Sequence, residues 1–411
     1  MKITFLGAGR EVGRSAIQIQ TDTEILLDYG YKQYKNAPLQ EKYPINAFNH
    51  PKAKNVILSH AHLDHCGGLP LLFENQNPRV FTTPPTIPMI NLLLKDSIKI
   101  GDAAFGKKHV QKLFNNIVKT KYGKRYQLSK RTTFTLTDAG HILGSAQTMI
   151  ESEKKILYTG DLKTTPMMLN KPAKPEKTDI LIIESTYAQK DHPDRFEVEK
   201  TFIKEVEKTV ETGGVALIPS FAIGRTQEMI SLLSMNGFEP FVAGMGLKVS
   251  EIYQNYSNYL PNPGAFIKAL KKTTPVNKKT FPKTLDSSIV VTTAGMLEGG
   301  PVLNYITKIN KNSKIFLNGY QAEETNGRML IEQGKIKINN QIIEVDTPYQ
   351  FFDFSAHPGK TELVNYVKKT NPEKIFCVHG NEESCIAFAE TLKREGFNAT
   401  APKNGETFKI Q

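Results

Sequence analysis

The sequence is poor in cysteine, and this scarcity excludes two kinds of small-domain scaffold. Its 411 residues include only Cys66, Cys377 and Cys385, and no CxxC pair is present. An odd, sparse set of cysteines argues against a disulfide framework and favours a reducing compartment. Without a CxxC pair, a structural zinc ribbon is not supported.

Long hydrophobic runs are also missing. No stretch approaches the ~20 apolar residues of a membrane-spanning helix. Residues 1–6 lead directly into an apolar strand and lack the long apolar run and cleavage site of a signal peptide. We therefore expect a cytoplasmic protein with no membrane partner. A length of 411 residues favours two domains, or one domain with a large insert.

Positive charge is abundant and concentrated in one segment. The net charge is +12, which suggests an anionic partner, nucleic acid first. Residues 94–131 hold 11 Lys/Arg against 2 Asp/Glu, a net of +9. This basic segment is either an RNA contact or a solvated helix face. The RNA contacts that we expect from it are Lys107, Lys108, Lys121, Lys124 and Arg125.

The pattern of strands and helices changes twice along the chain. The first part contains short strands and tight turns, and residues 2–6, 16–20 and 24–28 are expected to form an antiparallel meander. After an apolar strand at 179–184, helices and apolar strands alternate, which predicts a parallel, doubly wound sheet. Asp194 is expected to cap the helix at 194–211. From about residue 349 the first pattern returns, with strands that are followed by His357 and His379. The segment of alternating helices and strands is therefore inserted within the first architecture.

The strongest chemical signal is His-Ala-His-Leu-Asp-His at residues 60–65. It places three imidazoles and a carboxylate within six residues, directly after a buried strand at 55–59. Zinc binds such N and O ligands. His60 and His62 can meet one metal, while Asp64 and His65 can turn toward a second. A surface loop that binds metal weakly is the alternative, and the strand and glycine turn on either side argue against it.

Further candidate ligands also stand at strand ends. His141 follows a strand at 133–137, and Asp161 ends a strand at 155–159, where its two oxygens could bridge two metals. Asp28 ends the strand at 24–28, and we expect it to orient a ligand histidine from behind. By contrast, His50, His109 and His192 match no ligand position, and the glycine-rich turn at 7–13 lacks the following helix of a nucleotide site.

The H-x-H-x-D-H run with its later His and Asp resembles the metallo-β-lactamase superfamily, which includes esterases and lactonases as well as nucleases. Three further motifs resemble those of the β-CASP nucleases: Glu184-Ser-Thr-Tyr, Ser355-Ala-His357-Pro-Gly and Val378-His379-Gly. The resemblance spans essentially the whole chain. It implies an α/β protein with a metallo-β-lactamase αββα sandwich in residues 1–186 and 352–411, and an inserted doubly wound β-CASP domain in residues 187–351.

The resemblance also implies a ligand set and a mechanism. His60, His62, His141 and Asp161 would hold one zinc ion, and Asp64, His65, Asp161 and His379 a second. Hydroxide shared by the two metals would attack RNA phosphodiesters, leaving 5′-phosphate and 3′-hydroxyl ends. His357, paired with Glu184, is the candidate acid for the leaving oxygen, and Asp64 belongs to the catalytic set.

Within this family a histidine at the position of His379 accompanies RNA enzymes, so we expect single-stranded RNA as the partner. Family loops in the insert suggest further RNA contacts at Arg225, Gly295 and Met296, although a plain turn explains the glycine-rich stretch equally well. An inactive or weakly active RNA-binding scaffold subunit and a small-ester hydrolase on the same fold are the alternatives. A homodimer and other RNA-processing or decay proteins as partners stay open.

The choice between endonuclease and 5′-to-3′ exonuclease also stays open. RNase J-like exonucleases use a Gly-Arg-Ser-Met run to bind a 5′-phosphate, and this chain has Gly244-Met-Gly-Leu at the corresponding place.

Overall fold

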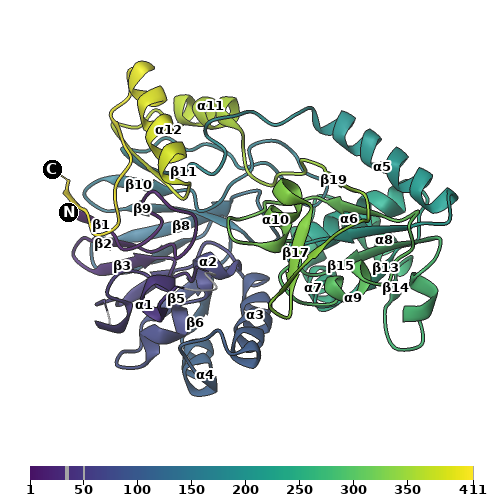
Figure 1. Cartoon of the computed structure of the whole chain (residues 1–411). Coiled ribbons are helices and arrows are strands. Elements are labelled where there is room, and N and C mark those ends of the chain that lie inside the picture. Colours follow the sequence, from purple (N-terminus) through teal and green to yellow (C-terminus); the bar gives the residue numbers. More distant parts are fainter. Residues whose placement is uncertain (33–36, 50, 411) are drawn as a thin grey trace. The chain divides into compact units, whose positions relative to one another are not determined.

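The computed structural model describes residues 1–32, 37–49 and 51–410, so His50 lies outside the described residues. It contains two compact units: a first unit of Met1–Asp191 and Ala356–Gln411, and an inserted unit of His192–Ser355. The chain therefore changes unit four or five residues later than the boundaries expected from the sequence at 186/187 and 351/352. In Figure 1 the sequence colours show the same break: purple and yellow segments share one unit, and green segments form the other.

The first unit contains two seven-stranded sheets. In the first sheet, β1 to β3 form the expected antiparallel meander, and β3 to β6 run parallel. The C-terminal β22 pairs antiparallel with β1 at the other edge. The strand order of this sheet is β22 (Thr407–Lys409), β1 (Lys2–Phe5), β2 (Ile17–Gln20), β3 (Glu24–Leu27), β4 (Asn55–Ile57), β5 (Arg79–Thr82) and β6 (Ile117–Lys119).

The second sheet combines parallel strands β10, β11, β20 and β21 with antiparallel strands β7, β8 and β9. Its strand order is β21 (Ala399–Thr400), β20 (Lys374–Val378), β11 (Ile180–Glu184), β10 (Lys155–Tyr158), β9 (Ala146–Glu151), β8 (Thr133–Asp138) and β7 (Arg125–Gln127).

Alternation along the strands explains the layers. Successive side chains of a strand point to opposite faces. In β11, Ile180 and Ile182 enter the core between the two sheets, whereas Leu181 and Ile183 pack under α11 (Lys360–Thr370) and α12 (Glu382–Arg394). Because both faces are covered, the first four residues of the strand, Ile180 to Ile183, are all apolar. The other helices of this unit are α1 (Leu39–Lys42), α2 (Leu63–Cys66), α3 (Thr86–Ile100) and α4 (Lys107–Asn115).

The inserted unit contains the expected parallel sheet with helices between its strands, and this prediction is confirmed. Asp194 caps α5 as expected, because its side chain accepts a hydrogen bond from Glu197 N at 3.1 Å. The strand order is β14 (Thr274–Pro275), β13 (Phe241–Ala243), β15 (Ser288–Thr292), β12 (Val215–Pro219), β16 (Lys314–Leu317) and β19 (Tyr349–Phe351). The helices are α5 (Arg195–Glu211), α6 (Arg225–Met235), α7 (Gly246–Asn255), α8 (Pro263–Lys271), α9 (Val302–Ile306) and α10 (Asn326–Gln333).

The first pattern of strands was expected to return from about residue 349, and the inserted domain was expected to end at residue 351. β19, at Tyr349–Phe351, pairs with β16 and forms an edge of the inserted sheet. A hairpin of β17 (Lys335–Ile338) and β18 (Gln341–Glu344) precedes it. No helix of the described residues is long and apolar enough to cross a bilayer.

Candidate metal centre

The residues of the 60–65 loop are positioned by a fully buried strand and a close backbone contact. All three residues of β4 are buried, and the chain then turns so that His62 precedes the short helix α2. Gly30 makes this turn possible: a Cβ atom on it would lie 1.7 Å from the carbonyl oxygen of Asp64. The loop backbone therefore packs directly against the end of β3, which supplies Asp28.

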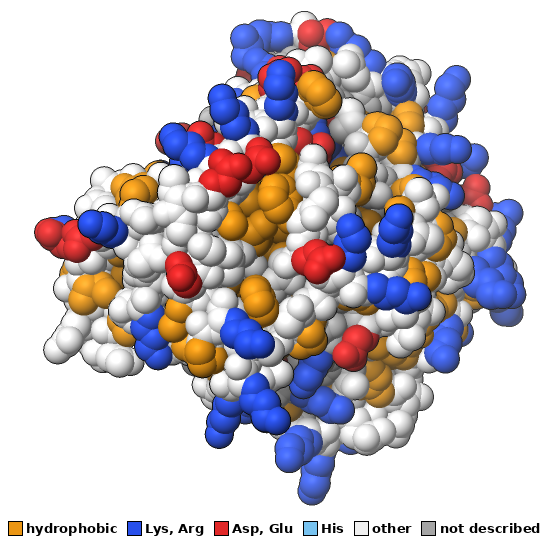
Figure 2. All heavy atoms as spheres, turned by 90° about the vertical axis from the view of Figure 1, so that its right-hand side faces the viewer, with side chains coloured by type: hydrophobic (Ala, Val, Ile, Leu, Met, Phe, Trp, Pro, Cys, Tyr) orange, Lys and Arg blue, Asp and Glu red, His pale blue; other side chains and the backbone are white. Residues whose placement is uncertain are grey.

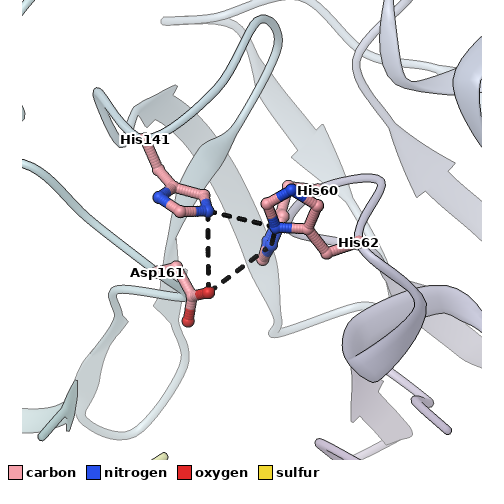
Figure 3. A group of neighbouring side chains, drawn as sticks. All are labelled: His60, His62, His141 and Asp161. Carbon is pink, nitrogen blue, oxygen red and sulfur yellow. Dashed lines mark hydrogen bonds and ion pairs between the residues drawn. The ribbon is translucent and has the colours of Figure 1, made fainter. Parts of the chain in front are cut away.

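His60, His62, His141 and Asp161 converge from three separate segments of the first unit (Figure 3). His60 Nε2 lies 3.1 Å from His62 Nδ1, and His141 Nε2 lies 3.2 Å from the same atom. Asp161 Oδ2 is 3.6 Å from His60 Nε2 and 3.7 Å from His141 Nε2. The structure thus brings together the four side chains that the resemblance assigns to the first metal.

A second set of donors uses the other oxygen of Asp161. His65 Nε2 lies 3.3 Å from Asp161 Oδ1, 3.3 Å from His379 Nε2 and 3.7 Å from Asp64 Oδ2. His379 Nε2 lies 3.2 Å from Asp64 Oδ2. The backbone fixes His379 in the left-handed region at φ 51°, where its amide donates to the Ala8 carbonyl of the glycine-rich turn. Asp161 therefore faces both sets, one oxygen to each.

The two donor sets fit divalent metals. A tetrahedral ion with ligands at 2.0–2.2 Å separates its donor atoms by about 3.3–3.6 Å, which is close to the distances in both sets. Metal-binding imidazoles must be neutral. Burial, together with neighbouring histidines, holds the pKa values of His60 and His141 well below the ordinary range. The Nε2 atoms of His60 and His141 both lie within hydrogen-bonding distance of His62 Nδ1. A cation bound among the three nitrogens would stabilise this arrangement.

Asp28 supports this centre from behind, at the end of β3. It is fully buried, and its Oδ1 accepts a hydrogen bond from Ser59 N at 2.7 Å. Its Oδ2 accepts from Ser59 Oγ, His65 Nδ1 and Tyr158 Oη, each at 2.7 Å. The bond from His65 Nδ1 leaves Nε2 directed at the second donor set. Asp28 thus fixes the orientation of His65, in the position expected from the sequence.

Replacing Asp28 with Asn is expected to weaken zinc affinity about 10- to 100-fold, because partners of this kind orient ligand imidazoles and raise their basicity. Titration against a chromogenic chelator measures the change. Tyr158→Phe is the matched control, since it removes one donor to Asp28 and keeps the carboxylate. Unchanged zinc affinity in Asp28→Asn would contradict the role of Asp28.

His357 and Glu184 form a third group beside Asp161. His357 Nδ1 lies 3.0 and 2.9 Å from the two oxygens of Glu184, which is buried at the end of β11. Burial opposes a charge on His357, but the carboxylates of Glu184, Asp161 and Asp64 together outweigh it, so the pKa of His357 is raised. The ring of His357 also lies 4.7 Å from that of His141. The pair therefore places a protonatable imidazole at the border of the first donor set.

Two supporting contacts were not expected from the sequence. The backbone carbonyl of Ala356 accepts a hydrogen bond from His141 Nδ1 at 3.1 Å. Lys163 Nζ donates to the carbonyl of His357 at 3.0 Å and pairs with Glu362 at 2.9 Å. The short stretch that carries His357 therefore also orients His141. A backbone carbonyl leaves no trace in the sequence, and a lone lysine two residues after Asp161 is too weak a signal to notice.

The expected RNA contacts of the basic segment lie at the surface. All five of Lys107, Lys108, Lys121, Lys124 and Arg125 are exposed. Arg125 pairs with Glu151 at 2.9 Å. Between β6 and β7, Tyr122 Oη donates to the Ser145 carbonyl at 2.6 Å, and the Ser145 hydroxyl accepts from His141 N. Lys121 and Lys124 thus lie on either side of Tyr122, which is hydrogen-bonded to the loop that carries His141.

Arg225, expected to contact RNA, has a buried side chain with partners inside the protein. Its side chain is 7% exposed, and its guanidinium donates to Glu228 and to the carbonyl of Phe354. The neighbouring Arg195 also pairs with Glu228, at 2.6 Å. Burying a guanidinium requires paired partners of this kind. Arg225 therefore links α6 to the Phe354 carbonyl within the inserted unit, and an RNA contact by Arg225 stays a prediction.

The glycine-rich loop after β15 is engaged in internal contacts. Gly295 is buried, and a Cβ atom on it would lie 2.9 Å from Phe221 N. Its carbonyl accepts from Gln321 Nε2 at 3.0 Å, and the Met296 carbonyl accepts from Gly327 N at 2.9 Å. Packing accounts for Gly295, and an RNA contact by this loop stays a prediction.

The remaining described histidines have other partners. His109 Nδ1 accepts from Gly106 N, and His192 Nδ1 lies 2.9 Å from Asp353.

Three family models match the chain in succession. A beta-lactamase superfamily domain matches residues 23–213, and a Beta-Casp domain matches residues 226–330. A Zn-dependent metallo-hydrolase RNA specificity domain matches residues 342–402. The models together cover both units of the structure.

Curated proteins match over the full length. A probable RNase of Methanocaldococcus jannaschii is 38% identical over 100% of both chains. RNase aCSPSF2 of Saccharolobus solfataricus is 35% identical over 99% of this chain and 85% of its own. The transcription termination factor FttA of M. jannaschii is 32% identical over 96% of this chain and 69% of its own. A crystal structure of an Enterococcus faecalis protein shares the fold, with a TM-score of 0.66 and 13% identity, covering 100% of this chain and 99% of that chain.

The fold and the converging donor sets define a metallo-hydrolase with a second, inserted unit. The chain belongs to the metallo-β-lactamase/β-CASP family of ribonucleases. It is a metal-dependent ribonuclease, a hydrolase that binds RNA and a divalent metal.

Proposed function

We propose that this protein is a two-zinc ribonuclease that hydrolyses RNA phosphodiesters to 5′-phosphate and 3′-hydroxyl ends. The observation that carries the proposal is the pair of donor sets that share Asp161, each with separations suited to zinc. A cytoplasmic location, association into a homodimer and association with other RNA-processing proteins stay predictions.

The geometry supports the two ligand sets that the resemblance implies. His60, His62, His141 and Asp161 would hold one ion; Asp64, His65, Asp161 and His379 would hold the other. When bound, two zinc ions supply an activated water for in-line attack and neutralise charge on the phosphoryl oxygens. Asp161 sets the spacing of the two sets, because its Oδ2 faces the first and its Oδ1 faces the second.

His357 then protonates the leaving 3′ oxygen. That alkoxide is strongly basic and needs a proton, and an imidazolium at the border of the first donor set can give one from Nε2. Glu184 keeps Nδ1 engaged and favours the charged ring. Glu184 is itself held by the backbone amide of Leu162 at 2.8 Å, so the acid and its partner are fixed together.

Cleavage of 5′-labelled and internally labelled single-stranded RNA tests the function and its mode together. The holoenzyme is expected to cleave both RNAs, to stop when a chelator removes the metal, and to leave 5′ ends that a ligase accepts. A release of single nucleotides from the 5′ end would assign the exonuclease mode, and internal fragments the endonuclease mode. Cleavage that continues after metal removal, or products with 5′-hydroxyl ends, would contradict the proposal.

The lysines of the basic segment are expected to contact RNA phosphates and to release counterions, which makes RNA affinity depend on salt. Lys107, Lys108, Lys121 and Lys124 are exposed, and no salt bridge involves them among the described residues. For single strands, log affinity falls with log salt by about 0.7 per phosphate contact, so replacing all four with Gln should make the slope shallower by up to about 3 units. The measurement is kcat/KM for a long RNA across a salt series.

Hydrolysis of a nitrophenyl phosphodiester is the internal control for this variant. It should not change, because charges outside the donor sets do nothing to the attacking water. An unchanged salt slope on RNA would show that these lysines are solvated and face away from the substrate.

A further inference from the structure

A second group of lysines stands in the inserted unit. Residues 268–283 contain six lysines and no acidic residue. We name this group the 268–283 lysine cluster. Its members are Lys268, Lys271, Lys272, Lys278, Lys279 and Lys283.

The charge of the inserted unit is otherwise acidic. Residues 192–355 hold 18 Lys/Arg and 17 Asp/Glu, a net of +1. Without the cluster, the same unit holds 12 Lys/Arg against 17 Asp/Glu, a net of −5. A lysine-rich composition would spread positive charge evenly along the chain. The unit instead gathers it in 16 residues, so a local cause is required.

The fold places the cluster at one edge of the inserted sheet. Lys268 and Lys271 end α8, and Lys278, Lys279 and Lys283 follow β14, which pairs with β13 at the sheet edge. Each of these five is exposed, and Lys272 is half-buried. Lys308 joins them, since its Nζ lies 5.2 Å from the ring centre of Phe281.

The cluster is not neutralised within the protein. Among the described residues, no salt bridge involves any of its six members, whereas Lys314 and Arg195 of the same unit pair with acids at 2.7 and 2.6 Å. Figure 2, which looks at the side where α8 and β14 are labelled in Figure 1, shows Lys and Arg side chains more widely than Asp and Glu.

Protection of the sheet edge explains only part of this pattern. Natural edge strands are kept from pairing with other chains by prolines, short length or a few lysines. β14 is only two residues long and contains Pro275, so this edge is already protected from pairing. Two lysines at the C-terminal end of α8 also interact favourably with the helix dipole. Neither effect calls for Lys278, Lys279 and Lys283 beyond the strand.

We propose that the 268–283 lysine cluster is a docking surface for the phosphate backbone of single-stranded RNA outside the cleaved bond. The inference rests on the proposed ribonuclease function. The ligand is an extended polyanion, because ammonium groups spread over a helix end and the segment that follows the edge strand suit a run of phosphates rather than one. The cluster adds affinity for long RNA and takes no part in hydrolysis, since none of its lysines belongs to a donor set.

The test compares two triple variants of the full-length holoenzyme that remove equal charge. One replaces Lys271, Lys278 and Lys279 with Gln. The matched control replaces Lys200, Lys204 and Lys208, which are exposed on α5 of the same unit but lie among acids, with Gln. We measure kcat/KM for long single-stranded RNA across a salt series, and for a nitrophenyl phosphodiester.

The cluster variant should lose up to about 2 units of salt slope on long RNA, at about 0.7 per contact. The α5 variant should keep the parent slope, and both should hydrolyse the small diester at the parent rate. Equal slopes for the two variants would overturn the inference, because net charge alone would then account for binding. A parent protein that cleaves no RNA would instead overturn the proposed function.

An anionic membrane is the other polyanionic surface that could bind these lysines. Sedimentation with phosphatidylglycerol vesicles measures binding of the protein to such a surface directly. Vesicle binding that the cluster variant loses, with an unchanged RNA slope, would assign the surface to lipid and contradict the inference. Absence of vesicle binding together with the shallower RNA slope would support it.

Discussion

Asp161→Asn is expected to abolish RNA cleavage and to lower the zinc content of the purified protein. The substitution keeps the size of the side chain but removes the charge that faces both donor sets, through Oδ2 to His60 and through Oδ1 to His65. The amide of asparagine has a single, neutral oxygen for binding metal. It therefore cannot coordinate two cations, as the two oxygens of a carboxylate can. Zinc per chain by elemental analysis and the initial rate on labelled RNA measure the two effects.

Asp179→Asn is the matched control for that variant. Asp179 immediately precedes β11, the parallel neighbour of the strand β10 that leads to Asp161, and its Oδ2 accepts from Lys155 N at 2.7 Å, yet it belongs to neither donor set. This control should keep both zinc and activity. Full zinc content with normal turnover in Asp161→Asn would show that Asp161 does not bridge the two sets.

His357→Ala is expected to lower the rate of RNA cleavage by roughly 10²–10⁴, the usual contribution of a general acid. The zinc content should stay at the parent level, because the three histidines of the first donor set remain. A nitrophenyl phosphodiester should be largely spared, since its leaving group departs without a proton. Glu184→Gln should likewise slow RNA cleavage and largely spare the diester, because it removes the carboxylate that favours charged His357.

His192→Ala is the control for a histidine outside the centre, since its ring pairs with Asp353 in the inserted unit. Equal losses of His357→Ala on RNA and on the activated diester, or a fall in zinc content, would instead make His357 a ligand or a structural residue. That result is a real test, because Asp161, Glu184 and His357 also lie close enough to hold an ion.

The sequence predicted much of the centre because its signals are local. His60, His62 and His65 occupy one loop, and their spacing alone brings them together. Asp161 and His379 each follow an apolar strand, and parallel strands present their carboxyl ends at one edge of a sheet. β10, β11 and β20 are parallel in the structure, so a residue after any of them reaches the same place.

What the sequence could not predict depends on long-range pairing. The Ala356 carbonyl that orients His141 is a backbone group 215 residues away. The resemblance did not predict that Arg225 is buried, nor that it pairs with Glu228 one helical turn later. Likewise, the sequence near residue 349 does not show that β19 pairs with β16, because that pairing joins distant parts of the chain.

The central claim is that two zinc ions share Asp161, and anomalous X-ray diffraction at the zinc edge from crystals of the zinc-loaded protein tests it most directly. The account predicts two peaks, one bounded by His60, His62 and His141 and the other by Asp64, His65 and His379, with Asp161 between them. A single peak, or peaks away from Asp161 in a protein that cleaves RNA, would contradict it.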